Sequence, residues 1–214
     1  MRDSTRYRAV VAHYGHSVQL RSSGVVVVVG VRASMSGQTV YTPYATIYDR
    51  STHQVIASNP NAEYCSFRDG CSPEGAPYRS GGRLYLWIRY SPATGKLDMH
   101  VDNPLNGSYG QYFDWQSFYT VSPQSFTQAR VGTDFGSSPW DESYSYTRPA
   151  TSVKAAVYHN VRLTSYSGHK GDLSSWWVHH KLIAKPSGHA RVAIPHDLFN
   201  SGASFQTWFV PRSA

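Results

Sequence analysis

The clearest pattern of hydrophobic and polar positions lies between residues 84 and 101, where every second residue is apolar. The alternation runs on both sides of residues 91–96, Ser-Pro-Ala-Thr-Gly-Lys, which have the composition of a turn. A period of two places alternate side chains on opposite faces of a strand, so the segment predicts a β-hairpin with one face in the core. The outward face would carry Tyr85, Trp87, Arg89, Asp98, His100 and Asp102.

Strand patterns recur along the rest of the chain, whereas helical periodicity is nearly absent. The run Val25–Val29 is β-branched throughout and lies between Gly24 and Gly30, which predicts a strand buried on both faces. Further strands are expected at residues 39–48, 55–57, 112–118, 129–135, 155–163, 176–183, 190–194 and 205–210. Residues 59–82 and 136–152, which are interrupted by Pro, Gly and Ser, are expected to be long loops.

This organisation indicates an all-β fold. Roughly ten to twelve short strands between turns are typical of a sandwich or barrel. The chain has 214 residues, of which 40% are hydrophobic and 14% aromatic, and it shows no internal repeat or linker. We therefore predict a single domain over residues 1–214 that folds as a two-sheet antiparallel β-sandwich of the jelly-roll type.

Composition limits the classes of partner. The formal net charge is +7, but the Lys and Arg residues are dispersed, which argues against nucleic acid as the partner. The longest purely apolar run, Val25–Val29, is too short to span a membrane. Residues 1–6 lack the apolar segment of an export signal, so secretion would require a signal that this sequence does not include.

The two cysteines, Cys65 and Cys71, flank a short segment that ends in Gly70. They could close this segment as a disulfide, which would place the protein in an oxidising compartment outside the cytosol. The alternative is a pair of free thiols. The spacing is not that of a zinc site, because no second cysteine pair exists.

The hairpin at residues 87–101, Trp-Ile-Arg-Tyr-Ser-Pro-Ala-Thr-Gly-Lys-Leu-Asp-Met-His-Val, resembles the central hairpin of concanavalin-A-like lectin and glucanase domains. Residues 129–135, Ala-Arg-Val-Gly-Thr-Asp-Phe, resemble the catalytic strand of the eqolisins, which are secreted glutamic peptidases with a sandwich fold. The second resemblance implies that Asp134 stands in place of the catalytic Glu. The strand departs from the eqolisin pattern in having Arg130 where the family has an acid and in lacking Trp.

Several kinds of chemistry can be weighed from the residue types. The only three Glu residues do not form a glucanase signature, and Asp141 and Glu142, as neighbours on a strand, would point to opposite faces. The His residues lack the spacing of a zinc site. A loose set of oxygen ligands suits calcium, namely Asp98, Asp102, Asn103 and Asp114. A polysaccharide lyase would use Arg89, His100 and Tyr112.

Three functions remain open at this level. The leading hypothesis is a secreted protein that binds or processes an extracellular glycan, including an anionic one, with or without catalysis. Its candidate ligand-binding residues are Trp87, Arg89, His100, Asp102, Tyr112, Trp115 and Trp140. The second is an eqolisin-like acid peptidase that uses Asp134, with Glu142 as a further catalytic candidate. The third is a structural jelly-roll protein of the coat type.

Overall fold

The computed structural model describes residues 15–34, 40–66, 70–72, 78–79, 84–102, 113–134, 156–158, 161–172, 175, 183–184, 191–195 and 204–208. The chain groups into two compact units, residues 11–139 and residues 1–10 with 140–214. The prediction of one domain over the whole chain therefore stays a prediction. The described elements are antiparallel strands, and the described part of the chain contains no α-helix.

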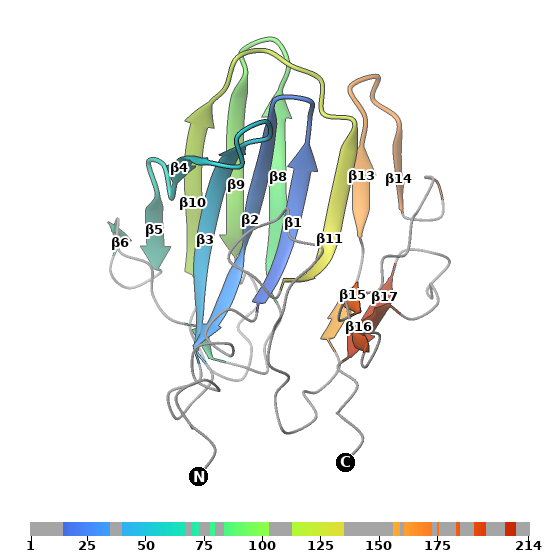
Figure 1. Ribbon diagram of the computed structural model, residues 1–214. Helices are drawn as coiled ribbons and strands as arrows, with labels where there is room; N and C mark the ends of the chain where they lie inside the picture. Colours follow the sequence, from blue (N-terminus) through green and yellow to red (C-terminus); the bar gives the residue numbers. More distant parts are fainter. Residues whose placement is uncertain are drawn as a thin grey trace. The chain divides into compact units, whose positions relative to one another are not determined.

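Two sheets make up the unit of residues 11–139 (Figure 1). The first, here called the valine sheet, has the order β11-β1-β2-β3-β4, with β7 also paired to β3. Its strands are β1 (Gly15–Arg21), β2 (Val25–Ser34), β3 (Val40–Asp49), β4 (Val55–Ser58), β7 (Tyr78–Arg79) and β11 (Gln128–Asp134). Every pairing in it is antiparallel.

The second sheet, here called the hairpin sheet, has the order β6-β5-β10-β9-β8. Its strands are β5 (Glu63–Ser66), β6 (Gly70–Ser72), β8 (Tyr85–Ser91), β9 (Lys96–Asp102) and β10 (Phe113–Thr120). These pairings are antiparallel as well. The two sheets confirm the predicted antiparallel β-sandwich.

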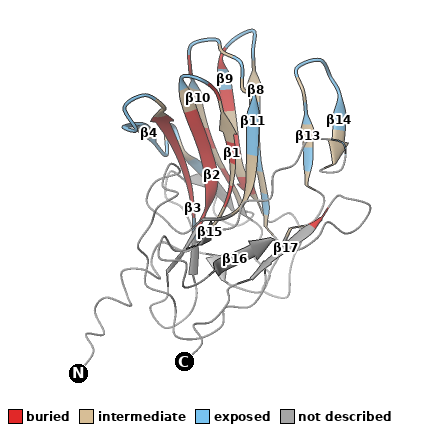
Figure 2. Ribbon diagram, turned by 45° about the vertical axis from the view of Figure 1, so that its right-hand side comes forward, coloured by how far each residue is buried: buried red, intermediate tan, exposed pale blue. Residues whose placement is uncertain are grey.

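The core lies between the two sheets and follows from the alternation on their strands. Every second residue of β2 and β9 enters it: Val27, Val29, Val31, Leu97, Met99 and Val101 are fully buried. Ala45, Ile47, Trp115 and Val121 complete the central cluster. Val26 and Val28, on the opposite face of β2, are also buried, so the strand is covered on both faces as predicted (Figure 2).

The other unit contains β12 (Ala156–Tyr158), β13 (Arg162–Thr164), β14 (Lys170–Asp172), β15 (Ile183–Ala184), β16 (Arg191–Pro195) and β17 (Phe205–Trp208). A four-stranded sheet has the order β12-β17-β16-β15, and β13 pairs with β14 alone. The described residues include no helix long and apolar enough to cross a membrane.

The sequence prediction was wrong about residues 59–82, which were expected to form a loop but contain β5, β6 and β7. These strands have four residues at most and few apolar positions, so they carry little alternation to recognise. Strand β1 was also missed. The expected loop at 136–152 and most of the expected strand at 176–183 lie outside the described residues.

Gly95 fixes the turn between β8 and β9. Its φ of +71° is a left-handed conformation, and its carbonyl accepts a hydrogen bond from the Val121 N–H at 3.0 Å. A Cβ atom at this position would lie 2.0 Å from the Val121 carbonyl oxygen. Glycine is therefore required here for both its backbone freedom and its lack of a side chain.

We expect Gly95→Ala to lower the free energy of unfolding by more than about 1 kcal/mol, because the left-handed backbone and the clash both oppose the methyl group. Urea denaturation measures this change. Gly24→Ala is the matched control, since a Cβ there would meet only the flexible Gln124 side chain at 3.3 Å. Equal stability losses in the two variants would contradict the account of the turn.

Candidate active site on the outer face of the hairpin sheet

The outer face of the hairpin sheet collects polar and aromatic residues in two cross-strand rows. Residues directly opposite each other in the pairing share a face. The acid row, as defined here, consists of Tyr85, Asp102, Asp114, Cys65 and Cys71, one from each strand. The neighbouring histidine row consists of Trp87, His100, Gln116 and Glu63.

Asp102 on β9 and Asp114 on β10 form a pair of carboxyl groups at the centre of the acid row. Burial, and to a lesser extent the neighbouring Asp114, raises the pKa of Asp102 from 3.8 to about 6. A neighbouring like charge disfavours ionisation, so Asp102 keeps its proton to a higher pH than an ordinary aspartate does. A protonated acid beside a carboxylate is the arrangement that general acid and general base catalysis require.

Asp114 is held by two neighbours. The Gln116 Nε2 amide donates a hydrogen bond to Asp114 Oδ2 at 2.6 Å. On the other side, His100 Nδ1 lies 3.5 Å from Asp114 Oδ1. Both neighbours come from the adjacent row, and the hydrogen bond from Gln116 orients the Asp114 carboxyl group.

Trp87 covers His100. The two rings stack with their centroids 3.5 Å apart and an angle of 12° between their planes. Burial lowers the pKa of His100, whereas Asp114 and Asp98 act in the opposite direction. Trp87 itself is 38% exposed and Tyr85 is 42% exposed, so one ring from each row is accessible to a ligand.

Three carboxylate oxygens on this face have unused hydrogen-bonding capacity. Asp98 Oδ1, Asp102 Oδ1 and Asp114 Oδ1 are buried, and none accepts a hydrogen bond from the residues that the structure describes. Lys96 Nζ approaches Asp98 Oδ1 to 3.3 Å, which neutralises part of the charge. Buried acceptors usually find donors, so these oxygens mark a place where water or a ligand would donate hydrogen bonds.

The structure brings together four of the predicted site residues and places two others, Trp115 and Asp134, elsewhere. Trp87, Arg89, His100 and Asp102 lie on this face, as the hairpin pattern predicted. The proposal that Trp115 binds ligand is wrong, because its side chain is 2% exposed and packs in the core. Tyr112, Trp140 and Glu142 lie outside the described residues.

Asp134 lies in the other sheet, as the last residue of β11, where its Cα partner is Gly15 of β1. Through Gly15 it is in register with Arg32 of β2. The described strands thus place Asp134 at an end of the valine sheet and not beside Asp102 and Asp114. Its catalytic role stays a prediction from the resemblance.

Sequence reasoning missed the roles of Asp114 and Gln116. Asp114 was considered only as a calcium ligand, and Gln116 was not considered at all. The available signal was weak because β10 reads Phe-Asp-Trp-Gln-Ser-Phe-Tyr-Thr, with a serine at a core position and Phe118 on the outer face. Only the pairing of β10 with β9 shows which face Asp114 shares.

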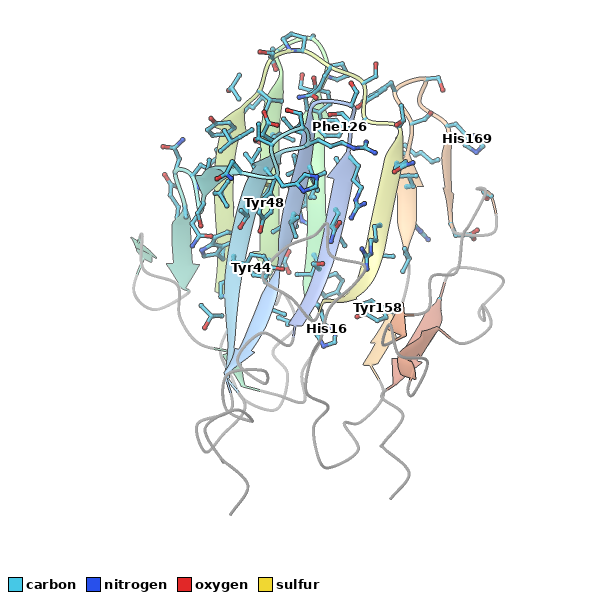
Figure 3. The ribbon with its side chains drawn as sticks, viewed as in Figure 1. His16, Tyr44, Tyr48, Phe126, Tyr158 and His169 are labelled. Carbon is cyan, nitrogen blue, oxygen red and sulfur yellow. The ribbon has the colours of Figure 1, made fainter. Side chains whose placement is uncertain are left out.

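Calcium finds no support among the described residues, where no group of three or more His, Cys, Asp and Glu side chains is placed to hold a metal ion. Asn103, part of the predicted calcium set, lies outside them. Elsewhere, His16 lies at one end of β1 (Figure 3), and its burial lowers its pKa to about 4. His16 is therefore uncharged at neutral pH.

Comparison with known proteins supports the fold. The chain is similar to the crystal structure of aspergilloglutamic peptidase from Aspergillus niger, with a TM-score of 0.57 and 14% sequence identity over 92% of this chain and 99% of that one. That protein is an eqolisin, so the likeness supports the eqolisin-like sandwich and not the lectin branch of the predicted resemblance. No protein-family model matches the chain, and no curated protein sequence does.

The raised pKa of Asp102 predicts a specific dependence of stability on pH. A carboxyl group whose pKa is higher in the folded state contributes stability that is complete below pH 3.8 and is lost as the pH rises through about 6. We expect Asp102→Asn to remove this loss, which is roughly 1 kcal/mol after screening at a half-exposed site is allowed for. Urea denaturation of both proteins at pH 4 and pH 7 measures it.

Asp49→Asn is the control for this measurement. Hydrogen bonds from Ser51 and Thr52 lower the pKa of Asp49 to about 2, so its contribution is lost only as the pH falls below 3.8. Its removal should leave the difference between pH 4 and pH 7 nearly unchanged. A wild-type pH dependence that persists in Asp102→Asn would show that another group causes it.

Proposed function

We propose that the protein is an acid hydrolase that cleaves peptide bonds with Asp102 and Asp114 as its catalytic pair. The observation that carries the proposal is the direct cross-strand pairing of these two carboxyl groups, with the pKa of Asp102 raised to about 6. Cβ atoms of directly opposite residues lie roughly 4.5–5.5 Å apart. A water molecule and a substrate carbonyl can therefore reach both groups.

The reaction follows from one proton shared between two acids. The Asp114 carboxylate takes a proton from water as the water oxygen attacks the carbonyl carbon. Protonated Asp102 then donates its proton to the leaving amine as the carbon–nitrogen bond breaks. The pair ends with the proton on Asp114, and its return to Asp102 through water restores the starting state.

Neighbouring groups support these roles. The Gln116 amide fixes Asp114 by its hydrogen bond to Oδ2, and the other carboxylate oxygen, Oδ1, accepts no hydrogen bond from the described residues. The exposed rings of Tyr85 and Trp87 border the pair and provide apolar surface for substrate side chains. The eqolisin-like fold supports peptide as the substrate, because the similar structure is named as a peptidase. The alternative catalytic residue remains Asp134.

The test is the cleavage of a peptide library or an acid-denatured protein between pH 3 and pH 7, followed by mass spectrometry. We expect cleavage that declines as the pH rises through about 6, where Asp102 loses its proton. Asp102→Asn and Asp114→Asn should each lower the rate on the order of a hundredfold or more, as expected for a lost general acid or base.

Asp98→Asn is the matched control, since Asp98 lies on the same face of β9 as Asp102 but opposite Phe118 rather than Asp114. It should retain most of the activity. Asp134→Asn decides between the two catalytic assignments. The proposal would be overturned if Asp134→Asn lost activity while Asp102→Asn and Asp114→Asn retained it. Catalysis would then be assigned to Asp134 on the valine sheet.

A second candidate, glycan binding without catalysis, is favoured by the exposed rings of Tyr85 and Trp87 on one strand face. Aromatic rings of this kind can stack on sugars, and the neighbouring carboxylates would accept hydrogen bonds from hydroxyl groups. Asp98 lies opposite Arg89 and near Lys96, whereas Asp102 and Asp114 lie together in the acid row, so this row suits a neutral or cationic glycan better than an anionic one. Retention on a glycan array that is lost in Trp87→Ala, without any peptide cleavage, would support this candidate.

A further inference from the structure

Cys65 and Cys71 occupy the last two positions of the acid row. They are Cα partners in the antiparallel pairing of β5 with β6. The flanking pairs, Tyr64 with Ser72 and Ser66 with Gly70, fix this register on both sides. The two cysteines, for which the sequence indicated a short loop closed by a disulfide, are thus placed directly opposite each other across two strands.

The backbone spacing of such partners suits a disulfide. Directly opposite Cα atoms in antiparallel strands lie roughly 4.5–5.5 Å apart. Disulfides usually join Cα atoms that are about 4.4–6.8 Å apart. A bond between the two cysteines therefore requires no movement of the strands.

A disulfide at this position would stabilise a short edge strand. Strand β6 has three residues and, among the described strands, pairs only with β5 at the edge of the sheet. So short an edge pairing is marginal without further support. Strand β5 in turn pairs with β10, where Cys65 is the Cα partner of Asp114. The two cysteines therefore flank the carboxyl pair on the side opposite Tyr85.

We propose that Cys65 and Cys71 form a cross-strand disulfide that fastens edge strand β6 to β5 beside Asp114. This proposal stands on the register alone and does not depend on the proposed hydrolysis. It adds the strand register to the spacing in the sequence, which indicated a disulfide with free thiols as the alternative. The covalent attachment of β6 to β5, at one end of the acid row, then depends on the redox conditions.

The oxidant is a small-molecule disulfide of the glutathione class. The thiolate of one cysteine attacks it, forms a mixed disulfide and releases one small thiol. The thiolate of the other cysteine then attacks the mixed disulfide, forms the Cys65–Cys71 bond and releases the second small thiol. Two protein thiols are oxidised while one small disulfide is reduced, as happens in compartments outside the cytosol.

The first measurement is the mass and thiol content of the full chain after equilibration with oxidised and reduced glutathione. We expect the protein to lose the mass of two hydrogen atoms, to show no thiol that iodoacetamide can alkylate after denaturation, and to yield a linked Cys65–Cys71 peptide. Two alkylated thiols, or glutathione adducts on both cysteines, would overturn the proposal. The Cys65→Ser/Cys71→Ser double variant is the control for alkylation.

The second measurement tests what the bond does. Hydrogen exchange of the β5 and β6 amides is compared before and after reduction, with the double serine variant as a matched control that cannot be oxidised. Closing the loop of residues 65–71 should protect these amides by up to about fiftyfold, on the scale of the loop-closure entropy. We expect reduction to speed exchange in β5 and β6 of the wild type and to leave the serine variant unchanged. Equal exchange in the oxidised and reduced wild type would show that the bond does not fasten the strand.

Failure of these measurements is distinguishable from failure of the proposed hydrolysis. Thiol content and amide exchange are read without a substrate. A protein that forms the disulfide but cleaves no peptide supports this inference and contradicts the catalytic proposal. A protein that cleaves peptide through Asp102 and Asp114 but keeps two free thiols does the reverse.

Discussion

The structure depends on the register in which β9 pairs with β8 and β10. Alternate residues of β9 point to opposite faces of the sheet. One face of the strand therefore places Leu97, Met99 and Val101 in the core, and the other directs Asp98, His100 and Asp102 outward. A slip of one residue would exchange the two sets. It would bury two carboxylates and an imidazole between the sheets and expose three fully buried apolar side chains, which is costly on both counts. The hydrophobic core therefore fixes the position of the polar face.

The same constraint creates the electrostatics of the candidate site. Once β10 is in register with β9, Asp114 lies opposite Asp102 and Gln116 lies opposite His100. The stacked rings of Trp87 and His100 help to cover the row next to the carboxyl pair. Partial burial then disfavours charge on Asp102, and the second carboxylate adds to the effect. As a result, Asp102 on this sheet face keeps its proton to a higher pH than an ordinary aspartate does.

Much of the fold could be predicted from the sequence because its information is local. Alternation at residues 84–101 and the β-branched run Val25–Val29 each identify a strand and its buried faces without reference to the rest of the chain. Strands β5 and β6 could not be predicted in this way, because they are short and polar. Strand β5 pairs with β10, which lies far along the chain, and β6 pairs with β5.

The residues of the candidate site likewise fall into two groups, those that a local pattern identifies and those that depend on non-local strand pairing. Trp87, Arg89, His100 and Asp102 were identified because they belong to one hairpin. Asp114 and Gln116 were not, since their face depends on the non-local pairing of β10 with β9 and the strand itself has an ambiguous pattern. For the same reason Trp115 was assigned to the surface although it fills the core. Resemblance to a catalytic strand drew attention to Asp134, which belongs to the other sheet.

The most direct test of this account is a carboxyl-carbon NMR titration of Asp102 in the wild type and in Asp114→Asn. The account predicts a midpoint of about 6 in the wild type, because Asp102 is partly buried and faces a second carboxyl group. The midpoint should fall in Asp114→Asn, since the neighbouring charge is gone while the burial remains. An ordinary midpoint near 3.8 in both proteins would show that the two residues do not form an acid pair, and the central claim would be wrong.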